Sequence, residues 1–370
     1  MTAAAAAAAA PQPVAGPSKR PLHQTAPTPT PTRQPGSGYL HLAPSSHHAR
    51  FSALSASYPL KLLAPTPLPS QPRHLGTCYT LAYGGGLVAG DLISLRVHVD
   101  QACGLVMLTQ GSTKVFKHRP GIRPMSHHAV RASSSSDSRV TQQRLHVTLE
   151  PGSMLLLLPD SVSPFRGSRY SQAQRFALPG CRTASVLILD WVNSGRGYRP
   201  AGSSALSKTE EDEEIWSMDS YASVNEVLIG DKLVMRERMV LDNHPCDRPN
   251  GNLSASPGPC PPDHLAVAAR LAPYHVYATV LILGPHLAPL ITHLNHLADK
   301  TSQFQLPKSP GLTWAFSNTD EQGGVLRIAG VEVEDVQRWL RGVLDADVMC
   351  WLAVWQGSRF WKKRHNKNEG

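Results

Sequence analysis

The 370-residue sequence predicts a mainly β protein with a few helices near its C-terminal end. From residue 92 onward, short apolar and β-branched runs are separated by Gly, Pro, Ser and Asp, a pattern typical of many short strands. The 28 glycines and 32 prolines suit frequent turns. Good helical periodicity occurs in only two segments, both after residue 284. These three observations favour one all-β body over a helical bundle.

The clearest strand pattern lies at residues 92–99, where Ile93, Leu95, Val97 and Val99 alternate with more polar residues. Because successive side chains of a strand point to opposite faces, this alternation predicts a strand with one buried face. Seven further runs predict strands at residues 104–110, 143–149, 153–159, 185–192, 224–230, 232–241 and 276–284.

Two late segments carry apolar residues at helical spacing. Residues 285–300 form the first segment. Residues 332–346 form the second, which begins with acidic residues, as the helix dipole favours. Each segment predicts a helix with one apolar face. The apolar stripes are Leu287, Leu290, Ile291, Leu294 and Leu297 in the first, and Val333, Val336, Leu340 and Leu344 in the second.

Composition divides the chain into a tail, one domain and a second tail. Residues 1–35 are rich in Ala and Pro and cannot build a core, so we expect them to be disordered. Residues 36–346 form the predicted β domain, and residues 347–370 form an atypical basic tail. Three polar stretches within the domain are expected to be disordered inserts, near residues 131–139, 196–214 and 242–264.

The formal net charge of +9 lies mostly outside the predicted domain. The first 90 residues contain six bases and no acid, and the last 13 contain five bases and one acid. The middle of the chain is therefore near neutral. A nucleic-acid-binding protein carries its bases on a folded face, so we expect no nucleic-acid partner.

Membrane and compartment signals are also weak. No apolar run reaches the roughly 18 residues of a membrane span. The six cysteines form no C-x-x-C pair, and a chain of this size does not need disulfides. We therefore expect mostly free thiols, a cytoplasmic location and no membrane partner.

Residues 83–91, YGGGLVAGD, contain four glycines: Gly84, Gly85, Gly86 and Gly90. A phosphate loop requires a helix directly after the glycines, whereas a strand pattern follows here, and Asp91 would repel phosphate. We therefore expect a tight or bulged turn between strands, where positive φ or close backbone approach requires glycine. Asp91 either caps this turn or offers a carboxylate to a metal cation.

A polar stretch interrupts apolar flanks at residues 108–116, LTQGSTKVF. Its side chains either form a polar lining or make hydrogen bonds across a turn. The residues concerned are Thr109, Gln110, Ser112, Thr113 and Lys114.

Motifs of common enzymes are missing from the sequence: there is no G-x-S-x-G, no H-E-x-x-H and no G-x-G-x-x-G before a helix. DWVNSGR at residues 190–196 collects Asp, Asn, Ser and Arg, but a Ser without a placed base is usually a turn residue. His293 and His296 have a spacing that can share a metal, yet no third ligand is evident. We predict no catalytic residue and no enzymatic activity.

Eight segments, taken in order, give the chain a resemblance to the urease accessory protein family UreD, especially its fungal branch. The resemblance covers residues 36 to about 346. The segments are YPLKLL, GGGLVAGD, LTQGSTKVF, LPDSVSPF, DWVNSGR, YASVNEVLIGDKLVMRERMVL, YHVYATVLILGP and GGVLRIAGVEVEDVQRWL. The motif residues expected to have structural roles are Gly84, Gly85, Gly86, Gly90, Asp190, Trp191, Ser194, Gly195 and Arg196.

The resemblance implies an elongated, two-layer, helix-like stack of strands with helices near the C-terminus, and no catalysis of its own. It implies a scaffold that binds apo-urease with UreF and, through UreF, the GTPase UreG. These proteins together deliver Ni(II) to the urease metallocentre. Ni(II) is therefore expected as a transient cargo and not as a tightly bound cofactor.

We hypothesise that Asp91 and polar residues of the stretch 108–116 line a polar passage for Ni(II). Ni(II) stands high in the Irving–Williams order, so a full His/Cys shell would retain it, whereas sparse oxygen ligands would release it. The candidate residues are Asp91, Thr109, Gln110, Ser112 and Lys114.

The sequence also departs from the family pattern. Asp160 stands where family members often carry Gln-Glu, and the end of the chain after Val348 differs from the family's ending. A long insert follows Arg196, with Glu210, Glu211, Glu213 and Glu214 as the nearest acids. Two other classes stay open: a β-sandwich binding module without a role in metal delivery, and a β-fold hydrolase that uses acids such as Asp160 and Asp190.

Overall fold

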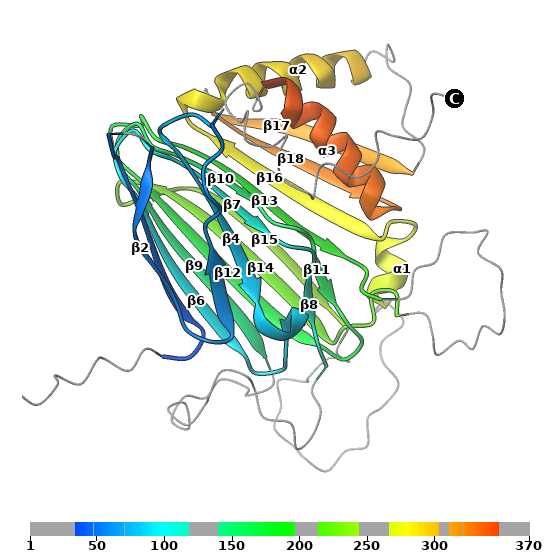
Figure 1. The fold of residues 1–370 in the computed structure, drawn as a ribbon. Coiled ribbons are helices and arrows are strands. Elements are labelled where there is room, and N and C mark those ends of the chain that lie inside the picture. The colour runs from blue at the N-terminus through cyan, green and yellow to red at the C-terminus, as the bar shows by residue number, and fades with distance from the viewer. Residues whose placement is uncertain are drawn as a thin grey trace, which may run out of the picture. The chain divides into compact units, whose positions relative to one another are not determined.

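Two β-sheets lie face to face, and helices cover the outer face of one of them (Figure 1). The computed structural model describes residues 34–46, 48–69, 71–117, 140–196, 214–243, 266–302, 311–320 and 322–347. Within these residues, one sheet has seven strands and is called sheet A. The other has eleven strands, carries the helices and is called sheet B.

Sheet A has the strand order β15-β14-β12-β9-β6-β1-β2. Its inner strands pair in parallel, and the two edge strands pair antiparallel with their neighbours. The strands are β1 (Ser37–Ala43), β2 (Arg50–Ala56), β6 (Leu92–Val99), β9 (Thr141–Leu149), β12 (Arg169–Leu178), β14 (Ser220–Ile229) and β15 (Lys232–Asp242).

Sheet B has the main order β17-β18-β16-β13-β10-β7-β4-β3. Strands β4, β7, β10 and β13 run parallel, and antiparallel strands flank them on both sides. The main strands are β3 (Leu60–Leu63), β4 (Leu75–Ala82), β7 (Gly104–Thr109), β10 (Met154–Leu158), β13 (Ser185–Asn193), β16 (Val276–Leu283), β17 (Leu312–Asp320) and β18 (Gly323–Gly330). Three short strands extend the sheet at one end: β5 (Gly86–Leu87), β8 (Thr113–Val115) and β11 (Val162–Pro164).

The middle of the chain alternates between the two sheets. Strands β6, β9, β12 and β14 belong to sheet A, and β7, β10 and β13, which lie between them in sequence, belong to sheet B. Each return to a sheet places the new strand parallel to the previous one. The chain therefore winds around the space between the sheets, in agreement with the two-layer, helix-like stack that the family resemblance implies.

Sheet B is apolar on both faces because both are covered. Leu155 and Leu157 of β10 belong to the inner core between the sheets, whereas Leu156 and Leu158 belong to the outer core beneath the helices. Successive side chains of a strand point to opposite faces. A strand that is buried on both faces therefore needs an unbroken apolar run, and MLLLL in β10 is such a run.

The two predicted helices are confirmed and form the outer layer. A 3₁₀ turn (Pro285–Leu287) leads into α2 (Ala288–Ser302), and α3 (Val333–Asp347) follows β18. Their predicted apolar stripes face sheet B, with Leu294 and Val336 fully buried in the outer core. The short helix α1 (Val267–Leu271), which precedes β16, was not predicted.

The eight predicted strands are also confirmed, although the run at 104–110 ends as a strand at Thr109. Strands β1 to β4, β17 and β18 were not among the predicted runs, and neither was β12, the ten-residue strand RYSQAQRFAL. Its buried face includes Gln172 and Gln174 beside Tyr170 and Phe176, so its apolar alternation is interrupted by amides. Those amides become important at the site described below.

Several predicted segments fall outside the described residues: 1–33, 131–139, 348–370 and most of the inserts near 196–214 and 242–264. The boundary of the last insert is well defined. The Asn243 side-chain amide donates hydrogen bonds to the carbonyls of Trp216 (2.7 Å) and Met218 (2.8 Å), and its oxygen accepts one from the Val267 amide (3.0 Å). One side chain therefore joins the end of β15 to the start of α1.

None of the helices described here combines the length and the apolar character needed to cross a bilayer. The cysteines within the described ranges, Cys78, Cys103 and Cys181, are free thiols, as predicted.

Candidate functional site

The glycine-rich segment connects β4 of sheet B to β6 of sheet A. Gly84, Gly85 and Gly90 have φ values of 80°, 74° and 85°, which favour glycine. Gly86 is extended (φ 173°), but a Cβ there would lie 2.7 Å from the Lys114 carbonyl oxygen. The predicted need for positive φ and for close backbone approach is thus confirmed.

Asp91 lies at the end of this segment and is completely buried. Its Oδ2 atom accepts a hydrogen bond from the Val88 amide (3.0 Å), and its backbone carbonyl accepts one from Gln142 (2.7 Å). The Thr141 hydroxyl donates to the Val88 carbonyl (3.0 Å). The Asp91 carboxylate therefore caps the turn that directs the chain into β6.

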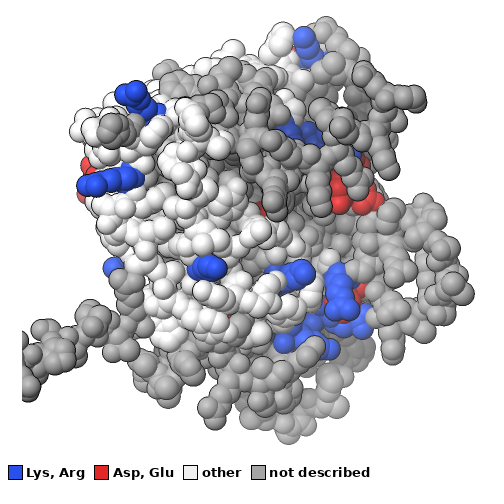
Figure 2. Space-filling model, in the orientation of Figure 1, with Lys and Arg blue, Asp and Glu red and all other residues white. Residues whose placement is uncertain are grey.

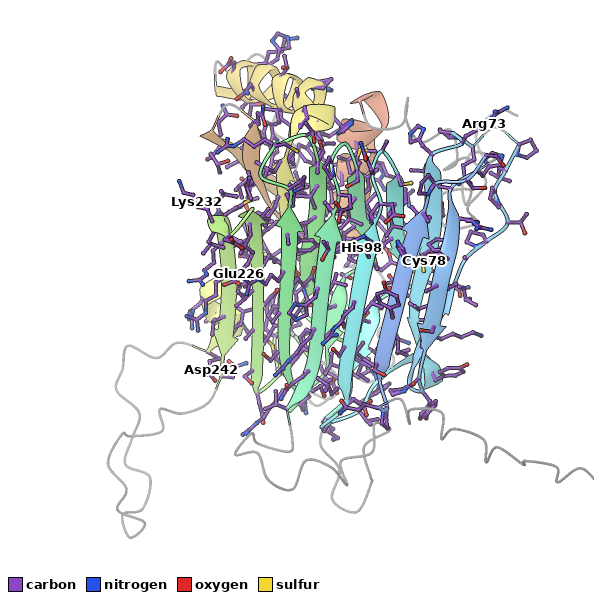
Figure 3. All side chains as sticks on the ribbon, turned by 90° about the vertical axis from the view of Figure 1, so that its left-hand side faces the viewer. Arg73, Cys78, His98, Glu226, Lys232 and Asp242 are labelled. Atoms are coloured by element: carbon purple, nitrogen blue, oxygen red, sulfur yellow. The ribbon has the colours of Figure 1, made fainter. Side chains whose placement is uncertain are left out.

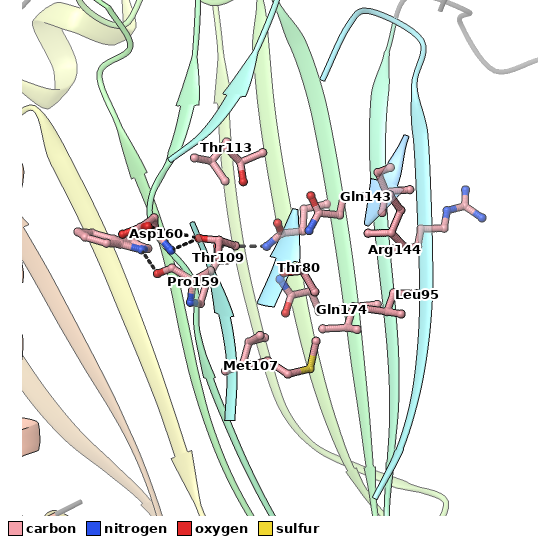
Figure 4. A pocket seen from close by; sticks show the side chains of 18 residues that line it. Thr80, Leu95, Met107, Thr109, Thr113, Gln143, Arg144, Pro159, Asp160 and Gln174 are labelled. Atoms are coloured by element: carbon pink, nitrogen blue, oxygen red, sulfur yellow. Dashed lines mark hydrogen bonds between the residues drawn. The ribbon is translucent and has the colours of Figure 1, made fainter. Parts of the chain in front are cut away.

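A cavity of about 60 Å³ lies between the two sheets, which is room for several water molecules. Figure 4 shows Thr109 and Asp160 on one side of it, and Gln143 and Gln174 on the other. Apolar residues such as Leu95 and Met107 complete the wall. The polar lining residues are Thr80, Thr109, Thr113, Gln143, Arg144, Asp160, Gln172, Gln174 and Asp190.

Asp160 is tied to the turn after β7. Its Oδ2 atom accepts a hydrogen bond from the Gly111 amide (2.7 Å), and its own amide donates one to the Thr109 hydroxyl (2.7 Å). Burial raises the pKa of the Asp160 carboxyl to about 6. The Gly111 hydrogen bond, a long one from the Thr109 hydroxyl to Oδ2 (3.5 Å) and the charge of Arg341 offset part of that rise. Asp160 therefore changes charge within one pH unit or so of neutrality.

Asp190 lies on β13 in sheet B and binds side chains of sheet A. It accepts hydrogen bonds from the Ser223 hydroxyl (2.5 Å) and from the side-chain amides of Asn225 (2.6 Å) and Gln172 (3.2 Å). Burial raises the pKa of the Asp190 carboxyl, and the three donors act against that rise. The Tyr170 hydroxyl extends the network by donating to Gln172 or Gln143.

A larger groove of about 540 Å³ adjoins the cavity. The two share Asp160 and Trp191 as lining residues, so this pair separates the interior from the groove. The Trp191 indole is held by a hydrogen bond to the Pro159 carbonyl (2.9 Å). Other groove residues include Ser112, Ser161, Asn193, Ser194, Gly195, His275, Glu332 and Gln337.

The structure separates the residues of the predicted polar passage. Thr109 lines the cavity and Ser112 lines the groove, on the two sides of Asp160. Gln110 and Lys114 are exposed and line neither space, and Asp91 is directed into its own turn.

The DWVNSGR motif at 190–196 is brought to the same place. Asp190 lines the cavity, and Trp191 lines both the cavity and the groove. Ser194 and Gly195 line the groove. The Asn193 side chain donates to the hydroxyls of Ser161 (2.9 Å) and Ser163 (2.7 Å). The exposed Arg196 lies over the ring of Phe165, outside both spaces.

Sequence reasoning missed the amides Gln143, Gln172 and Gln174 as lining residues. It treated Asp160 only as a departure from the family pattern and as an acid of the hydrolase alternative. The signal was present, because two glutamines at alternate positions, Gln172 and Gln174, are unusual on the buried face of a strand.

Charged side chains are dispersed on the surface drawn in Figure 2, singly or in small groups with uncharged areas between them.

The fold and the site define a class of protein: two packed sheets that enclose a cavity with both polar and apolar walls, with a helical layer outside. The family described as UreD urease accessory protein matches residues 34–361 of the sequence. The chain belongs to this family and is an accessory protein with a role in urease maturation.

Individual relatives agree with this assignment. Urease accessory protein 4 of Cryptococcus neoformans var. grubii is 58% identical over 313 residues, which cover 84% of this chain and 90% of the relative. Urease accessory protein D of Oryza sativa subsp. indica is 27% identical over 79% of this chain and 85% of its own length. UreD of the bacterium Sorangium cellulosum is 29% identical over 84% of this chain and 79% of its own length.

Proposed function

We propose that this chain is a non-catalytic cytoplasmic scaffold that binds apo-urease together with UreF, engages the GTPase UreG through UreF, and lets Ni(II) pass through its interior to the urease metallocentre. Family membership and the names of the relatives support the accessory role. The observation that carries the proposed passage is the cavity in the core between the two sheets, whose wall combines apolar and polar residues and which adjoins a groove at Asp160 and Trp191.

The chemistry of the lining suits a cation in transit. Eight of the nine polar lining residues offer carboxyl, hydroxyl or amide oxygens, and the ninth is the cationic Arg144. Such oxygens bind Ni(II) more weakly than a set of imidazoles and thiolates would. Asp160, with its pKa of about 6, is largely ionised at neutral pH and attracts a cation at the boundary. The Asp190 carboxylate already accepts three hydrogen bonds, so it offers a weak second contact and not a trap.

The proposed passage therefore differs from the one first hypothesised from the sequence. It leads from the groove, past Ser112 and Asp160, into the cavity lined by Thr109 and Asp190. In this arrangement Asp91 acts indirectly, by fixing the turn before β6.

A urease activation assay tests both parts of the proposal. Cells that lack their own UreD receive this chain, UreF, UreG, apo-urease and nickel. The chain is then captured to ask whether UreF and apo-urease accompany it, and the nickel content of purified urease is measured. The variants are Asp160→Asn and Asp91→Asn, with the exposed Asp231→Asn in the β14–β15 turn as the matched control.

Capture of both partners and restored urease activity would support the scaffold role. A soluble, folded chain that captures neither partner would overturn it. The passage predicts that Asp160→Asn lowers the nickel content of urease while capture stays intact. Unchanged nickel content in that variant would overturn the passage and leave a binding scaffold without a role in metal transfer.

A further inference from the structure

We infer that His41, His98 and Asp100 form a binding site for a divalent transition-metal cation such as Zn²⁺ or Ni²⁺, with Glu150 as a fourth ligand. This site lies on the outer face of sheet A, away from the cavity between the sheets. It does not depend on the proposed nickel passage.

The geometry brings the ligand atoms of three adjacent strands together. His41 on β1 and His98 on β6 are direct partners in the parallel pairing, and their rings lie 4.9 Å apart. The Oδ1 atom of Asp100 is 2.8 Å from Nε2 of His41 and 3.1 Å from Nε2 of His98. An Oε1 atom of Glu150, which follows β9, is 3.6 Å from the same His98 nitrogen.

These spacings suit a bound ion. The ligand atoms of His41, His98 and Asp100 all lie within 4.8 Å of one another. Around a tetrahedral ion with bonds of about 2.1 Å, ligand atoms stand roughly 3.4 Å apart. The His–Asp pairs therefore need to separate by only a few tenths of an ångström. Two imidazoles with one or two carboxylates form a ligand set that borderline divalent metals accept.

The local fold makes the site accessible and partly enclosed. Leu40, Leu42, Val97 and Val99 point into the inner core, so the alternating residues His41 and His98 point outward. Figure 3 shows His98 on the outer face of sheet A. Side-chain exposures of 28% for His41, 29% for His98 and 27% for Asp100 leave room for an ion to enter.

The charges around His41 and His98 differ from those around His146, another histidine on the outer face of sheet A. Partial burial lowers the pKa of His146 on β9, and the nearby charges of Arg96, Arg175 and Arg144 lower it further. Three cations disfavour a metal ion there. His41 and His98 instead face the carboxyl groups of Asp100 and Glu150.

The test uses the full, tag-free chain at neutral pH, with Co²⁺ as a spectroscopic probe. Visible d–d absorption reports Co²⁺ in a nitrogen- and oxygen-ligated site, and Zn²⁺ or Ni²⁺ should displace it. We expect the double variant His41→Gln/His98→Gln to lose this absorption and one bound ion per chain. His146→Gln is the matched control from the same sheet face and should retain both.

A second readout covers the case in which the double variant folds poorly. Because the ion joins β1, β6 and β9 only in the folded state, Zn²⁺ at about 100 times its Kd should raise the Tm of the wild-type chain by roughly 5 °C. Asp100→Asn should reduce that rise, and His146→Gln should keep it.

Two results would overturn the inference. One is a wild-type chain without Co²⁺ absorption and without a Zn²⁺-dependent rise in Tm. The other is equal metal binding by wild type and the double variant, which would assign the metal to other groups. The Asp160→Asn variant should bind the probe normally, so a failure of the nickel passage and a failure of this site give different results.

Discussion

The Asp190 carboxyl group joins the two sheets through side chains that are far apart in sequence. Its hydroxyl donor, Ser223, and its amide donors, Asn225 and Gln172, all lie on sheet A. Asp190→Leu would remove the acceptor and leave these donors without it. Since an unsatisfied buried group is unfavourable, we expect a loss of about 3 kcal/mol in the free energy of unfolding. Urea denaturation would measure it.

The exposed Asp231→Asn substitution is the control for Asp190→Leu, and it should change stability by less than about 0.5 kcal/mol. Equal, small effects in both variants would show that the Asp190 network contributes no net stability.

The raised pKa of Asp160 predicts how the stability of the folded protein changes with pH. In the unfolded chain an aspartate titrates near 3.9, and in the folded protein Asp160 titrates at about 6. Between these values the folded state holds the proton more tightly. The stabilisation due to the proton is therefore fully present below about pH 4 and is lost as pH rises to about 6.

The measurement compares wild type with Asp160→Asn, which cannot titrate but can still accept the Gly111 hydrogen bond. The unfolding free energy of wild type minus that of the variant should fall between pH 4 and pH 6 and stay level above it. A flat difference, or one that rises with pH, would contradict the assigned pKa.

Single residues of the site were visible in the sequence, but their partners were not. The pattern drew attention to Asp190 and to the stretch 109–114, because polar groups between apolar flanks need partners. Asp160 and Gln172 meet them only after the strands are stacked, and no local rule gives that stacking. For the same reason, the sequence left Asp91 open between a turn cap and a ligand, and it could not give the hydrogen bond from the Val88 amide.

At the level of elements, the glycine segment between β4 and β6 gives a graded prediction. At Gly85 an added Cβ meets no atom within 4 Å, so Gly85→Ala carries only the strain of positive φ, about 1 kcal/mol. At Gly86 the Cβ would meet the Lys114 carbonyl oxygen at 2.7 Å, so β5 and β8 must separate. Gly86→Ala should therefore be the more destabilising substitution. Chemical denaturation of the two variants would rank them, and the reverse order would contradict the described pairing of β5 with β8.

Element prediction succeeded where the buried pattern is simple. The period-two pattern of β6 and the apolar stripe of α2 follow directly from having one face in a core. It failed for β12, whose inward face carries Gln172 and Gln174 for the cavity. The strand of sheet A with the interrupted apolar pattern thus contributes residues to the proposed site.

At the level of the whole described fold, the helical layer determines whether sheet B can be exposed to water. A chain that ends at Gly284 would lack α2, β17, β18 and α3. It would uncover outer-core residues such as Leu156, Leu187 and Ile282. Exposed apolar patches of this kind promote association. We expect the shortened chain to be aggregated, as measured by its soluble fraction and by gel filtration.

The matched control is a chain that ends at Asp347, which keeps every contact described above and should elute as a folded protein. A soluble, non-associated chain ending at Gly284 would show that the helical layer is dispensable.

The whole-molecule arrangement was beyond local pattern analysis. The strand runs predict a β body, but the alternation of β6, β7, β9 and β10 between two sheets depends on pairings between distant segments. The family resemblance supplied that arrangement in advance, because it carries information about strand stacking that periodicity lacks.

The closure made by Asn243 has a practical consequence for engineering. Its side chain fixes both borders of the stretch 244–265, so the positions of β15 and α1 are set without reference to the residues between them. The entropy of closing a loop grows only with the logarithm of its length. A fluorescent reporter or an affinity module inserted within 244–265 therefore adds little strain to the frame, and this stretch is the natural place to label the protein for following its assembly with partners.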